Sequence, residues 1–167
     1  MVMMCGLPGV GKTTVARMLA PLISGVVISS DEIRKSLFRK PRYRRQDKKL
    51  IYDVLILLTG YLYNANVNCI LDATFSKEKT RQEVENKLRL APNKLQIIEC
   101  ICPEDIVMAR LRARTRDFSD ANYSVYIMMK KFYEPVKGEH TKIDTSRISK
   151  TEIWKLASDL LHPRQSE

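Results

Sequence analysis

"MCGLPGVGKTTVAR", residues 4–17, joins three local patterns within one short stretch. The apolar run from Val2 to Cys5 has the composition of a buried strand, and it breaks off into a turn rich in glycine and proline. A segment with helical periodicity follows at once, and its first residues are a lysine and two threonines. The stretch therefore predicts a strand, a loop with little side-chain bulk, and a helix that begins with one cation and two hydroxyl groups.

The spacing fits the P-loop pattern G-x-x-x-x-G-K-[ST], with Gly6, Gly11, Lys12 and Thr13 at the fixed positions. In that motif backbone N–H groups at the start of a helix surround phosphate oxygens, so we expect the loop to bind the phosphates of a nucleotide. Lys12 would reach the outer phosphates and assist catalysis, while the Thr13 hydroxyl would ligate the accompanying Mg²⁺. The residues expected to hold the nucleotide are Gly6, Pro8, Gly9, Val10, Gly11, Lys12, Thr13 and Thr14. The other interpretation is an ordinary turn before an amphipathic helix with an exposed lysine.

Length and composition limit the kind of protein. The 167 residues, of which 44% are hydrophobic, suffice for one domain with a sizeable core, so we expect a single domain over residues 1–167. No stretch is apolar over the ~18 residues of a membrane span, and the P-loop strand stands where a signal peptide would lie. We therefore expect a soluble, cytoplasmic protein that does not bind membranes.

Cysteine spacing also bears on the cellular compartment. The four cysteines form no C-x-x-C pair and no histidine-rich pattern, and three of them lie in apolar, strand-like runs. We expect buried free thiols of a reducing cytosol, rather than disulfides or zinc ligands, at Cys5, Cys69, Cys100 and Cys102.

The net charge of +10 favours anionic partners such as nucleotides, nucleic acid or phosphorylated metabolites. Much of this charge lies in a basic segment of about residues 38–49, just after a predicted helix start. Between Ile33 and Lys49 the basic residues are Arg34, Lys35, Arg39, Lys40, Arg42, Arg44, Arg45, Lys48 and Lys49. The segment either binds a polyanionic acceptor, with Arg42 and Arg45 as contacts, or is a solvated basic loop.

Strand-like and helical segments alternate along the chain, which is typical of a parallel sheet covered by helices. The strand-like runs are Val2 to Cys5, Gly25 to Ser29, Val67 to Asp72, Leu95 to Cys102 and a short one near Lys142 to Asp144. The helical segments are Lys12 to Leu22, Asp31 to Phe38, Asp47 to Asn66, Lys77 to Leu90, Pro103 to Arg114, Ala121 to Tyr133 and Thr151 to Leu161. We predict a three-layer α/β fold of the P-loop nucleoside-triphosphate hydrolase type, with a parallel five-stranded sheet and helices on both faces. Ligands of such sheets sit at the carboxyl ends of the strands.

Asp31 and Arg34 stand three residues apart at the start of a helix, so their side chains point the same way. A carboxylate there would orient or accept the proton of an acceptor hydroxyl, and an arginine would clamp an acceptor phosphate. The competing interpretation is local: Ser29 and Glu32 have the spacing of a capping box, and an aspartate in a first turn complements the helix dipole.

Asp72 ends the third apolar run, in "VNCILDATF". At the end of a strand beside a P-loop, such a carboxylate would bind Mg²⁺, directly or through water. Thr74, two residues on, would contact the acceptor or a phosphate. Aspartate at a strand end is also ordinary turn chemistry.

Arg110 and Arg114 share one face at the end of a predicted helix, before a polar break at about residues 113–122. Arginines on such a lid would neutralise the charge that develops on a transferring phosphoryl group. The alternative is a solvated basic helix end, favoured by the helix dipole.

The motifs "GLPGVGKTT", "SSDEIRK", "ILDATFSKEKTR", "RLRAR" and "SDANYSVY" together resemble the small kinases of the P-loop kinase superfamily, close to the kinase domain of polynucleotide 5′-hydroxyl kinases. The resemblance spans about residues 2–146. It implies ATP and Mg²⁺ on Lys12 and Thr13, and the strand-end aspartate of the family at Asp72. It also implies an acceptor-activating aspartate, an acceptor-binding arginine and lid arginines, which fall on Asp31, Arg34, Arg110 and Arg114.

The acceptor stays open at this point. The resemblance implies transfer of the γ-phosphate of ATP to a hydroxyl, of a polynucleotide 5′ end or of another anionic acceptor. Related kinases act on gluconate, adenylylsulfate, nucleotide sugars or aminoacylated tRNA, so a metabolite kinase is the first alternative. No phosphatase or ligase segment accompanies the kinase motifs in this chain.

Two further classes compete with a kinase. A nucleotide switch would need an N-K-x-D motif after a strand, but "NKLQ" at residues 93–96 precedes its strand and ends in glutamine. An ATPase without an acceptor, of the oligomeric motor type, usually needs a larger domain. The third possibility, a basic nucleic-acid-binding module with a vestigial P-loop, is disfavoured by the intact Lys12, Thr13 and Asp72.

Overall fold

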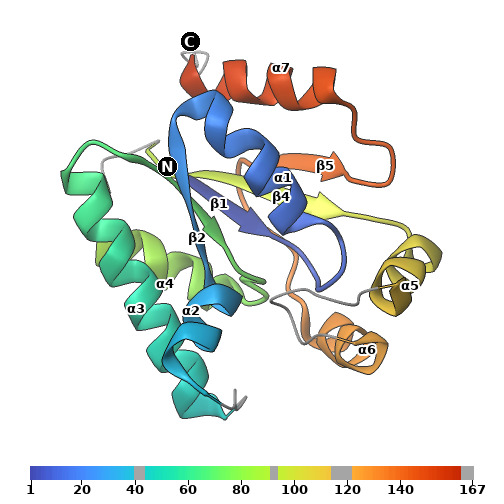
Figure 1. Cartoon of the computed structure of the whole chain (residues 1–167). Coiled ribbons are helices and arrows are strands. Elements are labelled where there is room, and N and C mark those ends of the chain that lie inside the picture. The colour runs from blue at the N-terminus through green and yellow to red at the C-terminus, as the bar shows by residue number, and fades with distance from the viewer. Residues whose placement is uncertain (40–43, 91–93, 114–121, 163–167) are drawn as a thin grey trace.

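The computed structural model describes residues 1–39, 44–90, 94–113 and 122–162 (Figure 1). Helices and strands alternate, as the sequence predicts. In chain order the elements are β1 (Val2–Cys5), α1 (Lys12–Leu19), the 3₁₀ helix η1 (Ala20–Ile23), β2 (Gly25–Ser29), α2 (Ser30–Leu37), α3 (Arg45–Asn64), β3 (Asn68–Asp72), α4 (Glu78–Leu88), β4 (Gln96–Ile101), α5 (Glu104–Ala113), α6 (Tyr123–Phe132), β5 (Thr141–Asp144) and α7 (Lys150–Leu161). Arg42, Arg114 and most of the expected lid lie outside the described residues.

The strands form one parallel sheet in the order β2-β3-β1-β4-β5, which confirms the predicted five-stranded sheet. β1 lies at the centre, between β3 and β4. In the register, Asp72 at the end of β3 pairs with Met4 on one side and with Ser29 on the other. The carboxyl ends of β1, β2 and β3 therefore meet at one edge.

Each face of the sheet buries its own set of side chains, because successive residues of a strand point to opposite faces. In β1, Val2 and Met4 pack with α1, α5 and α7, whereas Met3 and Cys5 pack with α3 and α4. Figure 1 shows α1 and α7 on one side of the sheet and α3 and α4 on the other. The three-layer prediction is confirmed.

Local capping differs from the sequence-based expectation at α2. Ser29 is the N-cap residue but its side chain makes no capping hydrogen bond, so the predicted capping box with Glu32 is wrong. Glu32 instead accepts a 2.9 Å hydrogen bond from Arg17 of α1. An unpredicted capping box opens α7, where Ser149 and Glu152 bond reciprocally.

The helix after the P-loop is also shorter than predicted. α1 ends at Leu19, and Pro21 lies in the first turn of η1. Proline has no backbone N–H group, and the first turn of a helix does not need one for its internal hydrogen bonds. α3 begins at Arg45, two residues earlier than expected. Among the helices that the structure describes, none is both long and apolar enough to cross a membrane.

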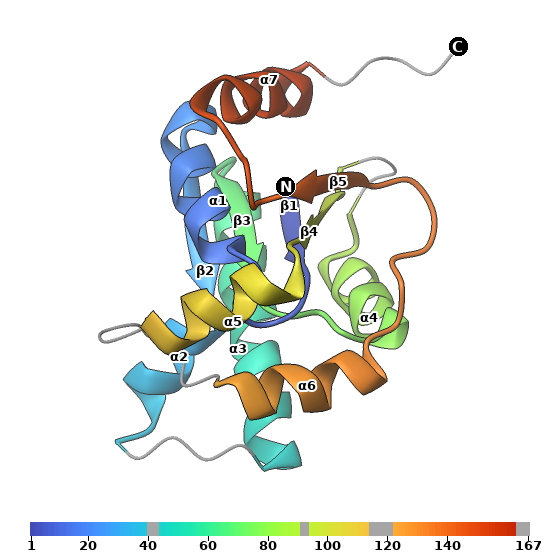
Figure 2. The same cartoon turned by 90° about the vertical axis from the view of Figure 1, so that its right-hand side faces the viewer.

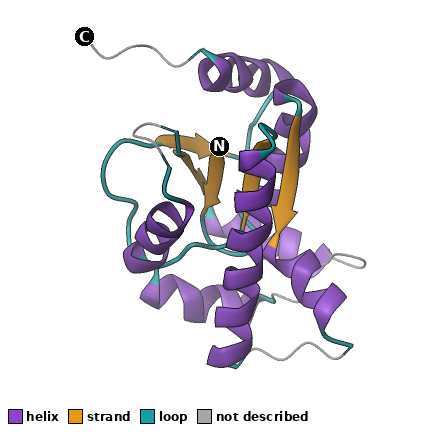
Figure 3. Ribbon diagram, turned by 90° about the vertical axis from the view of Figure 1, so that its left-hand side faces the viewer, coloured by secondary structure: helices purple, strands orange, loops and turns teal. Residues whose placement is uncertain are grey.

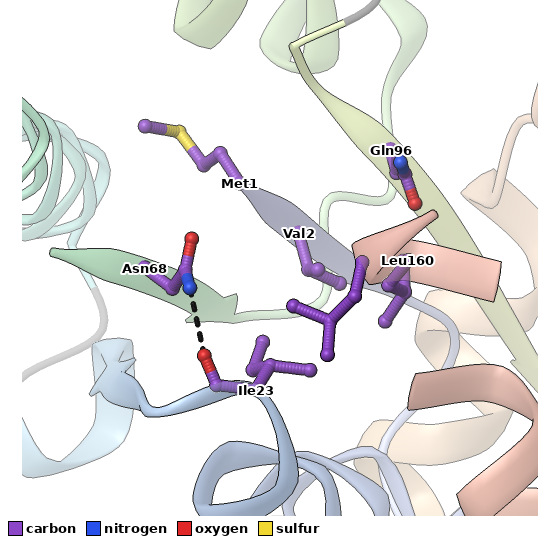
Figure 4. Close-up of a pocket in the computed structure, with 7 residues that line it drawn as sticks. Met1, Val2, Ile23, Asn68, Gln96 and Leu160 are labelled. Carbon is purple, nitrogen blue, oxygen red and sulfur yellow. Dashed lines mark hydrogen bonds between the residues drawn. The ribbon is translucent and has the colours of Figure 1, made fainter. Parts of the chain in front are cut away.

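The amino ends of the strands close around a cavity of about 30 Å³ (Figure 4). Val2, Ile23 and Leu160 line it, and the Asn68 side-chain amide donates a 2.7 Å hydrogen bond to the Ile23 carbonyl. A space of that size holds about one water molecule. A nucleotide cannot enter a space of that size.

Candidate active site at the carboxyl ends of the strands

The loop between β1 and α1 has glycine at the positions where its backbone takes positive φ angles. Gly6 has φ +137°, and a Cβ atom built there would lie 2.4 Å from the Cys100 carbonyl oxygen of β4. Gly11, at φ +92°, is the N-cap of α1. The sequence therefore places glycine where the chain must turn left-handed against its neighbours. The loop delivers the start of α1, with its unpaired N–H groups, to the carboxyl edge of the sheet.

Lys12 is the first residue of α1 and its side chain folds back along the loop. Its Nζ atom donates a 2.9 Å hydrogen bond to the carbonyl of Leu7, and the residue is 9% exposed. Within the loop, Gly6, Pro8, Gly9 and Val10 are buried, while Thr14 is exposed on α1. The cation thus lies across the concave side of the loop, where a bound phosphate would take over from the carbonyl as its partner.

Thr13 and Asp72 meet across the end of the sheet. The Thr13 hydroxyl donates a 2.6 Å hydrogen bond to Oδ2 of Asp72, although the two residues lie 59 positions apart. Asp72 is only 3% exposed, and its Oδ1 atom has no hydrogen-bond partner among the residues that the structure describes. A buried carboxylate oxygen without a partner costs free energy, and a hydroxyl beside a carboxylate is an oxygen set that suits Mg²⁺. The residues present fit that ion, which Thr13 and Asp72 would hold.

Arg110 of α5 lies beside the P-loop and is fixed by Thr145, a residue that sequence reasoning missed. Its guanidinium donates hydrogen bonds of 3.0 Å to the Thr145 hydroxyl and 2.8 Å to the Thr145 carbonyl. The Thr145 hydroxyl in turn donates to the carbonyl of Val10 in the P-loop. The chain Arg110–Thr145–Val10 therefore ties α5 and the end of β5 to the phosphate-binding loop. A lone threonine after a weak strand carries no sequence motif that would have revealed this role.

Asp31 and Arg34 both lie in α2, which starts at the end of β2 next to Asp72. Arg34 is 6% exposed, whereas Asp31 is half-buried. Burial raises the pKa of Tyr52 in α3 to about 12. The charge of Asp31 raises this pKa further, whereas the charge of Arg34 lowers it. Asp31 and Arg34 therefore both lie close enough to Tyr52 to influence its pKa.

Positive charge gathers on this side of the site. Desolvation lowers the pKa of Lys48 in α3, and the nearby charges of Arg34 and Lys77 lower it further. Arg45 is the exposed first residue of α3.

Thr74, which was predicted to contact the acceptor or a phosphate, is half-buried, and its carbonyl accepts a 3.3 Å hydrogen bond from the N–H of Gly6. Its backbone therefore supports the P-loop.

Arg81 of α4 is a second residue that the sequence did not reveal. It is 2% exposed and donates hydrogen bonds to the carbonyls of Phe75, Glu134 and Pro135, while its guanidinium pairs with Glu78 at 2.6 Å. These bonds fasten the chain just after α6 to the chain just after β3. α5 and α6 lie beyond the carboxyl ends of the strands (Figures 1 and 2). Arg81 therefore holds the chain that leaves the C-terminal end of α6.

The cysteines near the site are not poised for chemistry. Burial raises the pKa of Cys5 and of Cys100 to about 12, so both thiols are protonated and poor nucleophiles at neutral pH. All four cysteines are free thiols in the structure. The site therefore depends on oxygen and nitrogen groups.

Relatives by sequence are proteins of much greater length. The chain is 25% identical over 132 residues to the uncharacterized protein Rv2004c of Mycobacterium tuberculosis and to the uncharacterized protein Mb2027c of Mycobacterium bovis. Each match covers 72% of this chain and 26% of the relative. The matched stretch thus spans about a quarter of those proteins.

Solved structures share the fold over nearly the whole chain. A sugar kinase from Janibacter superposes with a TM-score of 0.70 at 19% identity, covering 96% of this chain and 92% of that one. A gluconokinase from Sinorhizobium meliloti gives a TM-score of 0.66 at 17% identity, covering 96% and 90%. The APS kinase CysC of Mycobacterium tuberculosis, solved with AMPPNP and APS, gives 0.66 at 17% identity, covering 96% and 94%.

These similarities show that the fold is that of P-loop kinases, as the sequence motifs predict. A family model described as "AAA domain" matches residues 1–136, which include the P-loop, Asp31, Arg34, Asp72 and α5. This chain therefore belongs to the AAA domain family, and its fold is the fold of P-loop kinases.

Proposed function

We propose that this chain is an ATP-dependent kinase that transfers the γ-phosphate of ATP to a hydroxyl group of an acceptor. The observation that carries the proposal is the Thr13–Asp72 contact at the start of α1, with the second Asp72 oxygen buried and without a partner among the described residues. A hydroxyl and a carboxylate beside a phosphate-binding loop are the groups that position the metal of a nucleotide. Mg²⁺, when bound, would neutralise the phosphate charge that builds up during transfer.

The P-loop residues would hold the donor. The N–H groups at the start of α1 would bind phosphate oxygens, and Lys12 would leave the Leu7 carbonyl to contact the outer phosphates. Arg110 would add positive charge from the side of β5, where Thr145 holds it. Arg114 is proposed as the second arginine of this group.

Asp31 would act on the acceptor. Its carboxylate would orient the acceptor hydroxyl and accept its proton as the oxygen attacks the γ-phosphorus, while the bond from that phosphorus to the bridging oxygen of ADP breaks. Arg34, in the same helix, would bind an anionic group of the acceptor. Both roles are consistent with helix α2 starting one strand away from Asp72.

The acceptor is proposed to be anionic, and a polynucleotide with a 5′-hydroxyl is the candidate that the basic segment favours. Its described residues Arg39, Arg44 and Arg45 are exposed. Arg42, which lies outside the described residues, is proposed as a further contact of the acceptor. The competing candidate is a metabolite kinase. The likeness to a sugar kinase, a gluconokinase and an APS kinase supports this candidate as strongly as the basic segment supports a polynucleotide.

Replacing Asp31 separates catalysis from binding. Asparagine has nearly the shape of aspartate, and Asp31 is not the N-cap residue of α2, so the Asp31→Asn variant should fold and bind ATP normally. Transfer should fall by ~10² or more, because the proton acceptor is gone. Unchanged turnover would leave Asp31 with a structural role only.

The salt dependence of binding separates the two acceptor classes. If the basic segment follows a single strand, the log–log slope of affinity against salt should be about −0.7 for each phosphate neutralised. The double reversal Arg44→Glu with Arg45→Glu should flatten that slope and leave ATP affinity unchanged. Fluorescence anisotropy of a 5′-hydroxyl oligonucleotide measures both, and absence of binding at low salt would favour the metabolite kinase.

A further inference from the structure

Helix α3 carries a stripe of exposed apolar side chains along its outer face. Leu50, Leu57, Leu58 and Tyr61 are 47%, 57%, 43% and 70% exposed, and Val54 between them is half-buried. Spacings of four, seven, eight and eleven residues place these side chains on one side of a helix. We call Leu50, Val54, Leu57, Leu58 and Tyr61 the α3 stripe.

The stripe is a second apolar face, because α3 is already packed on its other side. Ile51, Leu55 and Thr59 are fully buried and face the sheet. A helix that is apolar on both sides is normally covered on both sides. Figure 3 shows α3 standing in front of the sheet on this side of the molecule.

A groove adjoins the stripe where α3 crosses α4. It has a volume of about 560 Å³ and is lined by Leu57, Gly60 and Tyr61 of α3 and by Leu88 of α4, among others. Gly60 lies in the groove beside Leu88: a Cβ atom built there would make an ordinary van der Waals contact with the Leu88 side chain, at 3.7 Å. Polar and charged residues, Asp53, Asn64, Lys87 and Arg89, also line the groove, and Lys87 pairs with Asp53 at 2.6 Å. The apolar stripe therefore has a charged border on this side, and the stripe is the part that could receive side chains from a facing helix.

We propose that the α3 stripe binds a second copy of this chain, with the two α3 helices packed antiparallel about a twofold axis. Such an axis pairs a surface with itself, which requires the surface to be self-complementary. An axis between Val54 and Leu57 brings Leu50 against Tyr61 of the partner subunit and Val54 against the partner's Leu57, so that apolar side chains meet at the centre and both ends of the stripe.

The charges of α3 suit the antiparallel pairing. Arg45, Lys48 and Lys49 lie in its first turns, whereas its last turn holds no basic residue. The last carbonyl groups of a helix carry partial negative charge. In the antiparallel arrangement each basic helix start lies beside the carbonyl end of the other helix, whereas a parallel arrangement would place the two basic starts together. Arg45 is also a proposed acceptor contact, but the mass of the nucleotide-free chain reports on the α3 stripe without reference to kinase activity.

The mass in solution tests the proposal. Sedimentation equilibrium of the whole chain without nucleotide should give twice the chain mass of 19.3 kDa. The variant Leu57→Lys with Leu58→Lys should give the single mass while its thermal unfolding stays cooperative. Trp154→Lys on α7 is the matched control, because Trp154 is 63% exposed on another helix, and this variant should remain dimeric.

Cysteine cross-linking tests the direction of pairing. Mixed Leu50→Cys and Tyr61→Cys chains should form a disulfide between the two variants under mild oxidation, whereas each variant alone should not cross-link. A wild-type monomer at high concentration would overturn the proposal and leave the stripe to a different protein. A dimer that survives the double lysine substitution, or is lost equally in the Trp154 control, would overturn it too, and efficient cross-linking of either variant with itself would exclude the antiparallel arrangement.

Discussion

The hydroxyl of Thr13 donates a 2.6 Å hydrogen bond to Asp72, which joins the helix that follows β1 to the end of the neighbouring strand β3. The parallel pairing of β1 with β3 makes this contact possible, since it brings the end of each strand to the same edge. One carboxylate oxygen is used by Thr13 and the other faces inward without a partner among the described residues. We predict that Asp72 binds Mg²⁺ because its second carboxylate oxygen is buried and is not used by Thr13.

Asp72→Asn should weaken the binding of Mg²⁺ at the nucleotide site. Asparagine keeps an oxygen that accepts the Thr13 hydrogen bond but removes the negative charge that attracts a cation. The Mg²⁺ concentration for half-maximal ATP binding should rise about tenfold or more, while binding of ATP without metal changes little. Calorimetric titrations with and without Mg²⁺ measure the difference. Equal Mg²⁺ dependence in the wild type and the variant would remove Asp72 from the metal site.

Lys12→Ala should abolish most of the activity without unfolding the chain. The side chain makes one hydrogen bond, to a loop carbonyl, so its loss removes charge from the site and little from the core. A drop in transfer rate of ~10²–10³ is expected for losing a charge aimed at the reacting phosphates. Lys155→Ala, an exposed lysine of α7, is the control. Melting curves and nucleotide titrations compare the two variants, and normal ATP binding with normal turnover in Lys12→Ala would contradict the P-loop assignment.

Thr145→Val should loosen the P-loop from outside the motif. Valine matches the shape of threonine but leaves the Val10 carbonyl and one Arg110 donor without their partner. The free energy of unfolding should fall by about 1–3 kcal/mol, and ATP affinity should fall with it. Thr59→Val is the matched control: Thr59 is equally buried but bonds only within α3, so it should lose stability and keep its ATP affinity. ATP affinity unchanged in Thr145→Val would show that Arg110 and Thr145 do not shape the site.

Gly6→Ala should destabilise the fold through one close contact. The added Cβ atom would lie 2.4 Å from the Cys100 carbonyl oxygen, and backbone atoms cannot move aside cheaply. Gly138→Ala is the control, because Gly138 also has positive φ but nothing lies within 4 Å of its Cβ position. Denaturant titration should show a loss of about 1–2 kcal/mol for Gly138→Ala, from the left-handed backbone alone. The loss at Gly6 should be clearly larger, and equal losses would contradict the crowded packing of the loop.

The fold and the centre of the site could be predicted from the sequence because their patterns are local. Apolar runs and helical periodicity mark the elements, and the P-loop spacing fixes the positions of Gly6, Lys12 and Thr13 within a few residues of one another. Asp72 could be placed as well, since the carboxyl ends of parallel strands meet at one edge.

The supporting contacts could not be predicted, because they join residues far apart in the chain. Thr145 bonds to Val10 across 135 positions, and Arg81 binds carbonyls that lie more than 50 positions away. Arg17 competes for Glu32, which removes the capping box that the local sequence indicates. Such contacts depend on tertiary packing, and no short pattern in the sequence carries them.

Following the γ-phosphate of isotopically labelled ATP tests the proposed phosphoryl transfer most directly. The wild type is incubated with Mg²⁺ and a panel of 5′-hydroxyl oligonucleotides, sugars and nucleosides, with Asp31→Asn as the control. The label should appear on one acceptor class as a phosphate ester, and should be at least ~10²-fold lower with Asp31→Asn. Label that appears only as inorganic phosphate, at the same rate with and without every acceptor and in both proteins, would contradict a kinase and identify an ATPase without an acceptor.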